Sequence, residues 1–132
     1  MGSIQGFNHV SFSVRDAGLS AAWYQDVLGF AHHSDVQGPT FRRVRLRHPD
    51  SGVTVTLTAH ELGSGDAFSE LRTGLDHLAF SVGDGEIEEW KRRFEEKGVV
   101  HSEIRETGPG GGIITLRDPD DIQLEVVAAP AP

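Results

Sequence analysis

The sequence predicts an α+β fold in which two βαβββ units follow one another within a single domain of 132 residues. Residues 7–16, FNHVSFSVRD, resemble residues 75–84, LDHLAFSVGD, at an offset of 68 positions. Residues 46–50, LRHPD, resemble residues 116–120, LRDPD, at an offset of 70 positions. Because the two matches keep the same order and nearly the same offset, we interpret the chain (residues 1–132) as two copies of one unit.

The first unit covers residues 5–60 and begins with a strand over residues 6–14, where the side chains alternate in polarity. Asp16 is a suitable N-cap for a helix that continues to about Leu28 and is closed by Gly29. Leu19, Trp23 and Val27 recur at helical spacing, so we expect them on the apolar face of this helix. The three remaining strands are expected near residues 30–36, 40–47 and 53–60.

The second unit covers residues 74–127 and repeats this order, with a strand over residues 75–82 and a helix over about 85–97. Ile87, Trp90 and Phe94 share one face of that helix. Its remaining strands are expected near residues 99–106, 112–117 and 122–127. Residues 61–73 form a Gly/Ser-rich loop between the units. The glycine run 108–112 is expected to be a turn or a flexible lid, because the Lys and Ser/Thr of a phosphate-binding loop do not follow it.

Each strand has one apolar and one polar face, because successive side chains point in opposite directions. The apolar face is expected under the helices, whereas the polar face is either exposed to solvent or lines a cup. His9 matches His77 in the repeat, and alignment of the two turns places Thr56 opposite Glu125. All four positions lie on the polar face, and the pseudo-twofold axis of a duplication brings equivalent positions towards a common centre.

Three of these four residues form a set of two histidines and one carboxylate. Such a set suits divalent ions such as Fe²⁺, Mn²⁺, Co²⁺, Ni²⁺ or Zn²⁺. Three protein ligands leave coordination positions for water or substrate, as in reactive metal sites. We therefore expect one divalent metal ion on His9, His77 and Glu125, with Thr56 leaving a coordination position open.

Four segments carry a resemblance to a known family: His9-Val10, residues 24–30 (YQDVLGF), residues 76–80 (DHLAF), and residues 117–120 (RDPD) leading to Glu125. In these segments the chain resembles the vicinal oxygen chelate superfamily. That superfamily contains glyoxalase I, bleomycin-resistance proteins, fosfomycin-resistance thiol transferases, epimerases and extradiol dioxygenases. The resemblance implies a cupped mixed sheet with the helices outside.

The resemblance also carries the superfamily's metal positions over to His9, His77 and Glu125. In glyoxalase I and the epimerases the fourth position is usually an acid or amide, and here it is Thr56. This difference makes glyoxalase I activity unexpected. It favours similarity to the thiol transferases and the dioxygenases, whose fourth residue is not a ligand. Ser11, two residues after the first ligand, resembles the hydroxyl residue of the transferases.

Other side chains on the polar face of the first unit are candidates for binding substrate. They are Ser11, Phe41, Arg43, Arg45, Thr56, Thr58 and His60. Phe41 can stack on a ligand, and Arg43 and Arg45 form either a solvated strand face or a clamp for an anion, since arginine binds carboxylates bidentately. Arg47 is expected to be solvated, and His32 and His33 to be exposed at a sheet edge. His48 and His101 are expected to be structural or exposed rather than ligands.

Two functions remain open at this level. One is a metal-dependent enzyme with lyase, transferase or dioxygenase chemistry on a small oxygen-bearing molecule that chelates the ion. The other is a metal-free protein that sequesters a small molecule such as an antibiotic, which requires an apolar, aromatic-lined groove.

The amino-acid composition limits the classes of molecule that the protein is expected to bind. A net charge of −8 argues against nucleic acid and against an anionic membrane surface. The absence of cysteine excludes disulfides and cysteine zinc sites. No apolar run approaches the roughly 18 residues of a spanning helix, and no basic-then-apolar leader opens the chain, so we expect a cytoplasmic protein. Unpaired sheet edges favour a homodimer.

Overall fold

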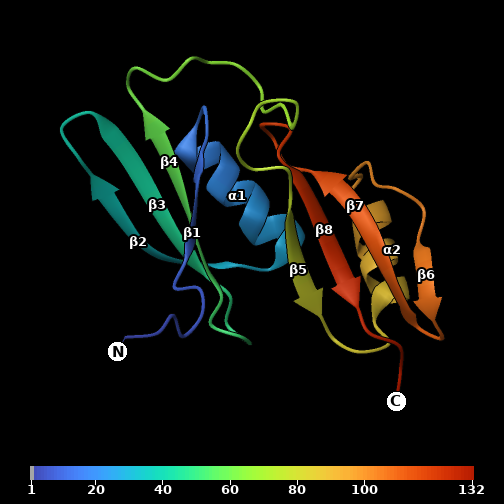
Figure 1. Cartoon of the computed structure of the whole chain (residues 1–132). Helices are drawn as coiled ribbons and strands as arrows, with labels where there is room; N and C mark the ends of the chain where they lie inside the picture. The colour runs from blue at the N-terminus through green and yellow to red at the C-terminus, as the bar shows by residue number, and fades with distance from the viewer. Residues whose placement is uncertain (1) are drawn as a thin grey trace. The chain divides into compact units, whose positions relative to one another are not determined.

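The computed structural model describes residues 2–132 as two compact units that are divided between Asp66 and Ala67. The division lies inside the loop that the sequence places between the two repeats. Each unit contains one helix and four strands in the order βαβββ (Figure 1). The predicted α+β fold of tandem βαβββ units is therefore confirmed. No helix within residues 2–132 has both the length and the apolar character needed to cross a membrane.

Unit 1 consists of β1 (Val10–Ser13), α1 (Ala17–Leu28), β2 (Ala31–Gln37), β3 (Phe41–Arg47) and β4 (Thr54–His60). Its sheet has the strand order β1-β4-β3-β2, in which β1 and β4 are parallel and the other pairs are antiparallel. The helix α1 packs on one face of this sheet against β2, β3 and β4. The apolar residues of that face, including Phe12, Val44 and Leu57, are buried beneath it.

Unit 2 consists of β5 (Leu78–Val82), α2 (Ile87–Glu96), β6 (Arg105–Gly108), β7 (Gly111–Arg117) and β8 (Gln123–Ala128). Its strand order is β5-β8-β7-β6, with β5 and β8 parallel. The helix α2 packs against β7 and β8. Ile87 and Phe94 are buried and Trp90 is half-buried, so the predicted apolar face of this helix is correct.

The limits of α1 agree with the sequence, and of the three residues predicted on its apolar face Val27 is buried, Trp23 is half-buried and Leu19 is not buried. The Asp16 carboxylate accepts a hydrogen bond of 3.0 Å from the Leu19 backbone N–H, and Gly29 closes the helix in the left-handed conformation at φ 79°. Leu19, which was expected to be buried, is 57% exposed. The buried face instead centres on Tyr24, which is fully buried and whose ring centre lies 6.0 Å from that of Phe12.

Three strands are shorter than the sequence predicts, because pairing rather than side-chain alternation decides where a strand begins. The strand predicted over residues 6–14 begins at Val10, where pairing with Val55 of β4 starts. Its counterpart begins at Leu78 instead of residue 75, opposite Leu124. The strand predicted over 99–106 begins at Arg105, and before it only His101 forms an isolated bridge.

The glycine run 108–112 forms the turn of the β6–β7 hairpin. Gly110 adopts φ +75°, a left-handed conformation that favours glycine. A Cβ atom at this position would also lie 2.9 Å from the Gly85 Cα atom. The turn expected from the sequence is therefore confirmed, and both conformation and space require glycine at its tip.

The loop 61–73 is tied to unit 2 near its C-terminal end. The Phe68 N–H donates a hydrogen bond of 2.8 Å to the Asp120 carbonyl. The two terminal nitrogens of Arg117 bind the two carboxylate oxygens of Glu70 at 2.8 and 3.2 Å. This hydrogen bonding lowers the pKa of Glu70 from 4.5 to about 2.

The strand register supports the repeat alignment on which the candidate site rests. In unit 1, Ser11 of β1 lies opposite Thr56 of β4, which in turn lies opposite Arg45 of β3. In unit 2, Ala79 lies opposite Glu125, which lies opposite Thr115. Thr56 and Glu125 therefore occupy equivalent places in the two sheets, and so do Arg45 and Thr115.

The turn that leads into β8 is built by a buried carboxylate. Asp118 is 5% exposed, and its Oδ1 atom accepts hydrogen bonds from the backbone N–H groups of Asp120 and Ile122 at 2.8 and 2.9 Å. In the equivalent turn of unit 1, His48 Nδ1 accepts from the Asp50 N–H at 3.3 Å. Asp118 thus fixes the start of the strand that carries Glu125.

We predict that Asp118→Ala lowers the free energy of unfolding by about 2–4 kcal/mol, because it leaves two buried N–H groups without an acceptor. Urea denaturation followed by circular dichroism measures the loss. The control is Asp50→Ala, an exposed position in the equivalent turn, which should change the stability by less than about 0.5 kcal/mol. Equal stability of the two variants would show that the carboxylate does not build this turn.

Candidate functional site

Unit 2 brings two of the three predicted metal ligands together. His77 immediately precedes β5, and Glu125 lies in β8, the strand that pairs with β5. The His77 Nε2 atom lies 3.5 Å from Glu125 Oε1. The Thr115 hydroxyl donates a hydrogen bond of 3.3 Å to the other oxygen, Glu125 Oε2. The carboxylate is thus oriented by a neighbour and presents one oxygen to the imidazole.

The ring of each candidate histidine is oriented by the residue that precedes it. His77 Nδ1 lies 2.7 Å from an Asp76 carboxylate oxygen, and His9 Nδ1 lies 2.7 Å from the Asn8 side-chain oxygen. Because both partners are acceptors at these atoms, each ring carries its hydrogen on Nδ1, which leaves Nε2 as the free lone pair. Histidines that bind metals usually have such a second partner, which fixes their tautomer and orientation.

The same contacts change the protonation of His77. The hydrogen bond to Asp76 raises the pKa of His77 above 6.5, and the negative charges of Glu125 and Asp76 raise it further, against a smaller opposing effect of desolvation. The protonated ring therefore stabilises the folded state at pH values below 6.5. This contribution is lost as the pH rises through the folded-state pKa.

The donor set in unit 2 fits a divalent ion. Two donors at about 2.1 Å from one ion lie about 3.0–3.4 Å apart at octahedral or tetrahedral angles, close to the observed separation of Nε2 and Oε1. Within residues 2–132, no three or more side chains of His, Asp or Glu gather closely enough to hold a metal ion. His9, the third predicted ligand, belongs to unit 1 and is exposed there.

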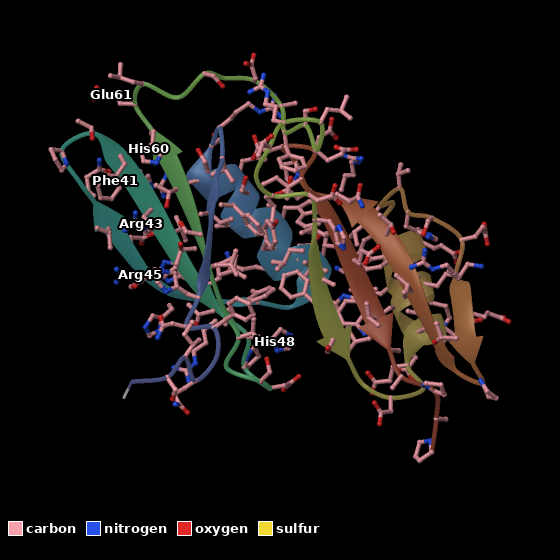
Figure 2. The ribbon with its side chains drawn as sticks, viewed as in Figure 1. Phe41, Arg43, Arg45, His48, His60 and Glu61 are labelled. Atoms are coloured by element: carbon pink, nitrogen blue, oxygen red, sulfur yellow. The ribbon has the colours of Figure 1, made fainter. Side chains whose placement is uncertain are left out.

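Unit 1 gathers the predicted substrate-binding residues on the polar face of its sheet. Figure 2 shows Phe41, Arg43 and Arg45 following one another along β3, with His60 beside Phe41 at the end of β4. The Arg43 Nε–H donates a hydrogen bond of 2.9 Å to the Thr58 hydroxyl, which lies 3.1 Å from the Ser11 hydroxyl. These contacts link three strands through side chains.

Aromatic packing completes this network. The Arg43 guanidinium carbon lies 4.8 Å from the centre of the Phe41 ring, and the His60 ring lies 6.2 Å from the same ring. A cation over an aromatic face at this distance is attracted to the ring. Arg43 is therefore held on its Nε side by a hydroxyl and on its face by a ring.

Thr56 has an unusual environment for a polar side chain. It is 3% exposed, and its hydroxyl has no hydrogen-bond partner among residues 2–132. The same holds for the Ser34 hydroxyl, which is shielded from solvent on β2. An unsatisfied buried hydroxyl costs about 1–3 kcal/mol, so it calls for a structural or functional explanation.

The other histidines have structural or exposed positions, as expected. His32 and His33 are exposed on β2, an edge strand of its sheet. His48 packs edge-on against Phe30 at 5.4 Å, and His101 packs against Phe94 at 5.9 Å.

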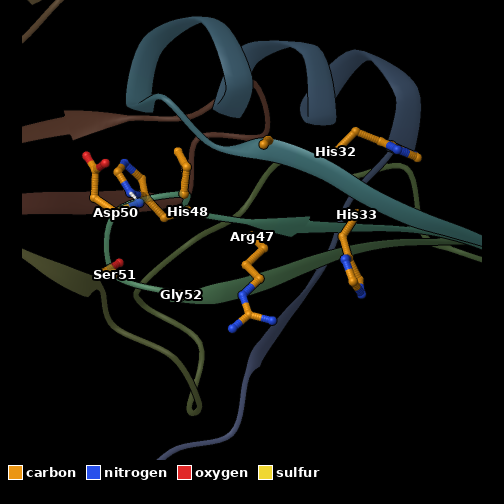
Figure 3. Close-up of a pocket in the computed structure, with 9 residues that line it drawn as sticks. His32, His33, Arg47, His48, Asp50, Ser51 and Gly52 are labelled. Carbon is orange, nitrogen blue, oxygen red and sulfur yellow. Dashed lines mark hydrogen bonds between the residues drawn. The ribbon is translucent and has the colours of Figure 1, made fainter.

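A shallow depression of about 480 Å³ lies beside the β3–β4 turn, where His33, Arg47 and His48 are among the residues that line it (Figure 3). His33 and Arg47 point to one side of the strands and His48 to the other, so their polar groups do not converge. None of the candidate site residues lines this depression.

Comparison with known proteins identifies the family. The profile of the glyoxalase/bleomycin resistance protein/dioxygenase superfamily matches residues 6–126, almost the whole chain. The chain belongs to this superfamily. The resemblance seen in the sequence is thereby confirmed.

Solved structures agree with this membership. A glyoxylase/bleomycin resistance protein/dioxygenase domain from Frankia sp. EAN1pec is 34% identical, with a TM-score of 0.86 over 96% of this chain and 99% of that one. The fosfomycin resistance protein FosX from Listeria monocytogenes, solved with Mn(II) and sulfate, is 19% identical. Its TM-score is 0.71 over 96% of this chain and 94% of that one, and this likeness establishes the fold.

Among curated proteins, the metallothiol transferase FosB of Staphylococcus epidermidis is 29% identical over 98 residues. That of Staphylococcus haemolyticus is 28% identical over the same length. Both alignments cover 73% of this chain, but only 63% of the length of the relatives. This superfamily member therefore spans less than two thirds of the length of these relatives.

Sequence reasoning missed four residues that the structure connects to the candidate site. They are Asn8, Asp76, Thr115 and Ser34. The first two had a signal, because an acceptor side chain precedes the matched histidine in both repeats. Thr115 was detectable only as the repeat counterpart of Arg45. Ser34 gave no signal, because a bulge between His32 and Ser34 changes which side chains of β2 face the polar side.

We predict that Asp76→Asn lowers the pKa of His77 towards 6.5, because the variant removes the carboxylate that raises it most. The protonated form of His77 is then lost at a lower pH than in the wild type. NMR titration of the imidazole ring protons in metal-free protein measures the midpoint. Asp84→Asn, a change at an exposed turn after β5, is the control and should leave the midpoint in place. An unchanged midpoint in Asp76→Asn would contradict the proposed orientation of the ring.

Proposed function

We propose that this superfamily member is a divalent-metal-dependent enzyme that acts on a small oxygen-bearing molecule, with His9, His77 and Glu125 as the metal ligands. The observation that carries this proposal is the paired geometry of the histidines. Each Nδ1 atom is engaged by the preceding side chain, and in unit 2 the free Nε2 lies 3.5 Å from a carboxylate oxygen. Such a pair needs a cation or a proton between its members to be stable.

When bound, a divalent ion supplies Lewis-acid polarisation of a substrate oxygen. The chain's own residues supply orientation. Asp76 and Asn8 hold the imidazole rings, and Thr115 holds the Glu125 carboxylate. Thr56, at the place equivalent to Glu125, contributes a neutral hydroxyl and leaves room for a substrate atom. Ser11, Thr58 and Arg43, with Phe41, Arg45 and His60, line the polar face on which the substrate is proposed to lie.

The names of the relatives bear on the type of reaction. Among lyase, transferase and dioxygenase chemistry, the name metallothiol transferase of the curated relatives favours group transfer. The FosX structure with Mn(II) favours manganese among the divalent ions that suit this ligand set. A metal-free sequestering protein is the second candidate, and the presence or absence of bound metal separates the two. The expected cytoplasmic location stays a prediction.

We predict that the purified protein binds one Mn²⁺ per chain and that His77→Ala weakens this binding by more than about 100-fold, since it removes a ligand rather than a supporting residue. Calorimetric titration of protein first stripped of metal measures the affinity and the stoichiometry. His33→Ala, an exposed histidine on β2, is the control and should bind Mn²⁺ like the wild type.

Circular dichroism should show that His77→Ala keeps the fold, because the side chain is 39% exposed. Absence of Mn²⁺, Fe²⁺ and Zn²⁺ binding in the wild type would exclude the enzyme proposal and favour the sequestering protein.

We also propose that the protein is a homodimer. Both sheets end in edge strands, β1 and β2 in unit 1 and β5 and β6 in unit 2, and unpaired edges favour pairing or cover. Light scattering at micromolar concentration should give twice the mass of the 14.3 kDa chain. A mass of one chain at that concentration would exclude the dimer.

A further inference from the structure

The polar face of the unit 1 sheet is electropositive in a protein whose net charge is −8. Arg43, Arg45 and Arg47 all lie on this face of β3. Phe41 of the same strand also lies on this face, and the other strands contribute only serine, threonine, histidine, valine and alanine to it. The only carboxylate within the four strands, Asp35 of β2, lies opposite Val44 and therefore on the other face. No side chain of this face can neutralise the arginines.

Two buried hydroxyls without partners lie in one row of this face. Ser34, Arg45 and Thr56 are consecutive cross-strand neighbours, so the unpaired hydroxyls flank Arg45 on both sides. Hydroxyl groups in such positions can donate hydrogen bonds to an acceptor that also binds the guanidinium. Neither Arg43 nor Arg45 forms an ion pair with a carboxylate anywhere in residues 2–132.

Arg43 lies in the next row of the sheet, and its side chain is already fixed by neighbouring residues before any ligand binds. Its Nε–H donates a hydrogen bond to the Thr58 hydroxyl, and one face of its guanidinium packs on the Phe41 ring. Its two terminal nitrogens can therefore donate hydrogen bonds to another acceptor. A pre-positioned guanidinium binds planar or tetrahedral oxyanions bidentately and loses little side-chain freedom in doing so.

From these observations we infer that the face between Arg43 and Arg45 is a binding site for an oxyanion, a carboxylate or a phosphoryl-type group. Thr56 and Ser34 supply neutral hydrogen-bond donors to it. Resting on the function proposed above, this oxyanion is the anionic group of the substrate, so the enzyme acts on an acidic small molecule. Arg43 and Arg45 then determine specificity for the acid over its neutral analogues.

The divergence of the two repeats supports this assignment. Glu125 and Thr115 of unit 2 occupy the places of Thr56 and Arg45 in unit 1. The same pair of positions therefore carries a carboxylate that attracts cations in one copy and a guanidinium that attracts anions in the other.

The test uses the 132-residue chain stripped of metal, titrated separately with inorganic phosphate and with malonate at constant ionic strength. Binding is measured by calorimetry and by NMR of the arginine Nε–H resonances. We expect saturable binding of at least one probe, and which probe binds more tightly distinguishes a phosphoryl from a carboxylate group. Arg43→Gln and Arg45→Gln should each weaken binding about tenfold or more, the loss of one charge-assisted contact.

Arg47→Gln is the matched control, because it removes the same charge from the same strand and face but at the strand end. It should change the affinity by less than about twofold. The proposed oxyanion site is contradicted if Arg47→Gln weakens binding as much as the other two variants, or if the wild type binds neither probe.

Thr56→Val provides a second measurement that does not depend on a charged residue. The substitution keeps the shape and removes the unpaired hydroxyl, so we expect a higher melting temperature without anion and weaker anion binding. A variant that binds the anion as tightly as the wild type would exclude Thr56 from the site.

Titration of the arginine variants with Mn²⁺ separates this inference from the proposed function. Unchanged metal binding with lost anion binding is the result that we expect. If the wild type binds metal but no anion, the proposed oxyanion site is contradicted and the proposed metal-dependent enzyme is not. If the wild type binds an anion but no metal, the oxyanion site is supported and the proposed metal-dependent enzyme is contradicted.

Discussion

The parallel pairing of the first and last strands of each unit determines which side chains can act together. This register places Ser11 beside Thr56 and Ala79 beside Glu125, and the neighbouring antiparallel strand adds Arg45 or Thr115 to the same row. A shift of one residue would move every one of these side chains to the opposite, helix-covered face. The buried apolar residues, such as Leu57 and Leu124, make that shift unfavourable because it would expose them to water. They therefore keep the polar side chains on their own face of the sheet.

On this shared frame the two copies have acquired opposite electrostatic character. Unit 2 holds an imidazole, a carboxylate and the Asp76 side chain close together, an arrangement that favours positive charge. Unit 1 holds Arg43 and Arg45, neither of which forms an ion pair among residues 2–132, beside hydroxyl groups on a face whose strands contribute no carboxylate.

Much of the fold could be predicted from the sequence because duplication repeats each signal. The Asp16 cap, the Gly29 terminus and the order of helices and strands along the chain were all predicted correctly. The errors lie where tertiary pairing decides the outcome. Residues 7–9 alternate in polarity but have no strand beside them, so β1 begins only at Val10. Leu19 has the right spacing for the core, yet Tyr24 and its aromatic neighbours occupy that place.

The candidate site could be predicted as a set of residue types but not as a network. His77 and Glu125 were identified from the repeat, and the structure places them 3.5 Å apart. The Asp76 and Asn8 contacts, the bond from Arg43 to Thr58 and the unpaired hydroxyls of Thr56 and Ser34 depend on rotamers and on a bulge. The alternation of polar and apolar residues along a strand predicts on which face of the sheet a side chain lies. The residues that it contacts follow only from the three-dimensional packing.

The claim that these ligands hold one divalent ion is tested most directly by anomalous diffraction from crystals grown with Mn²⁺. We predict a single manganese peak per chain, coordinated by Nε2 of His9, Nε2 of His77 and the Glu125 carboxylate, at about 2.0–2.3 Å. A peak on the exposed histidines of β2, His32 or His33, would contradict it. So would a structure at saturating Mn²⁺ in which the imidazole of His77 remains bound to Glu125 without a metal.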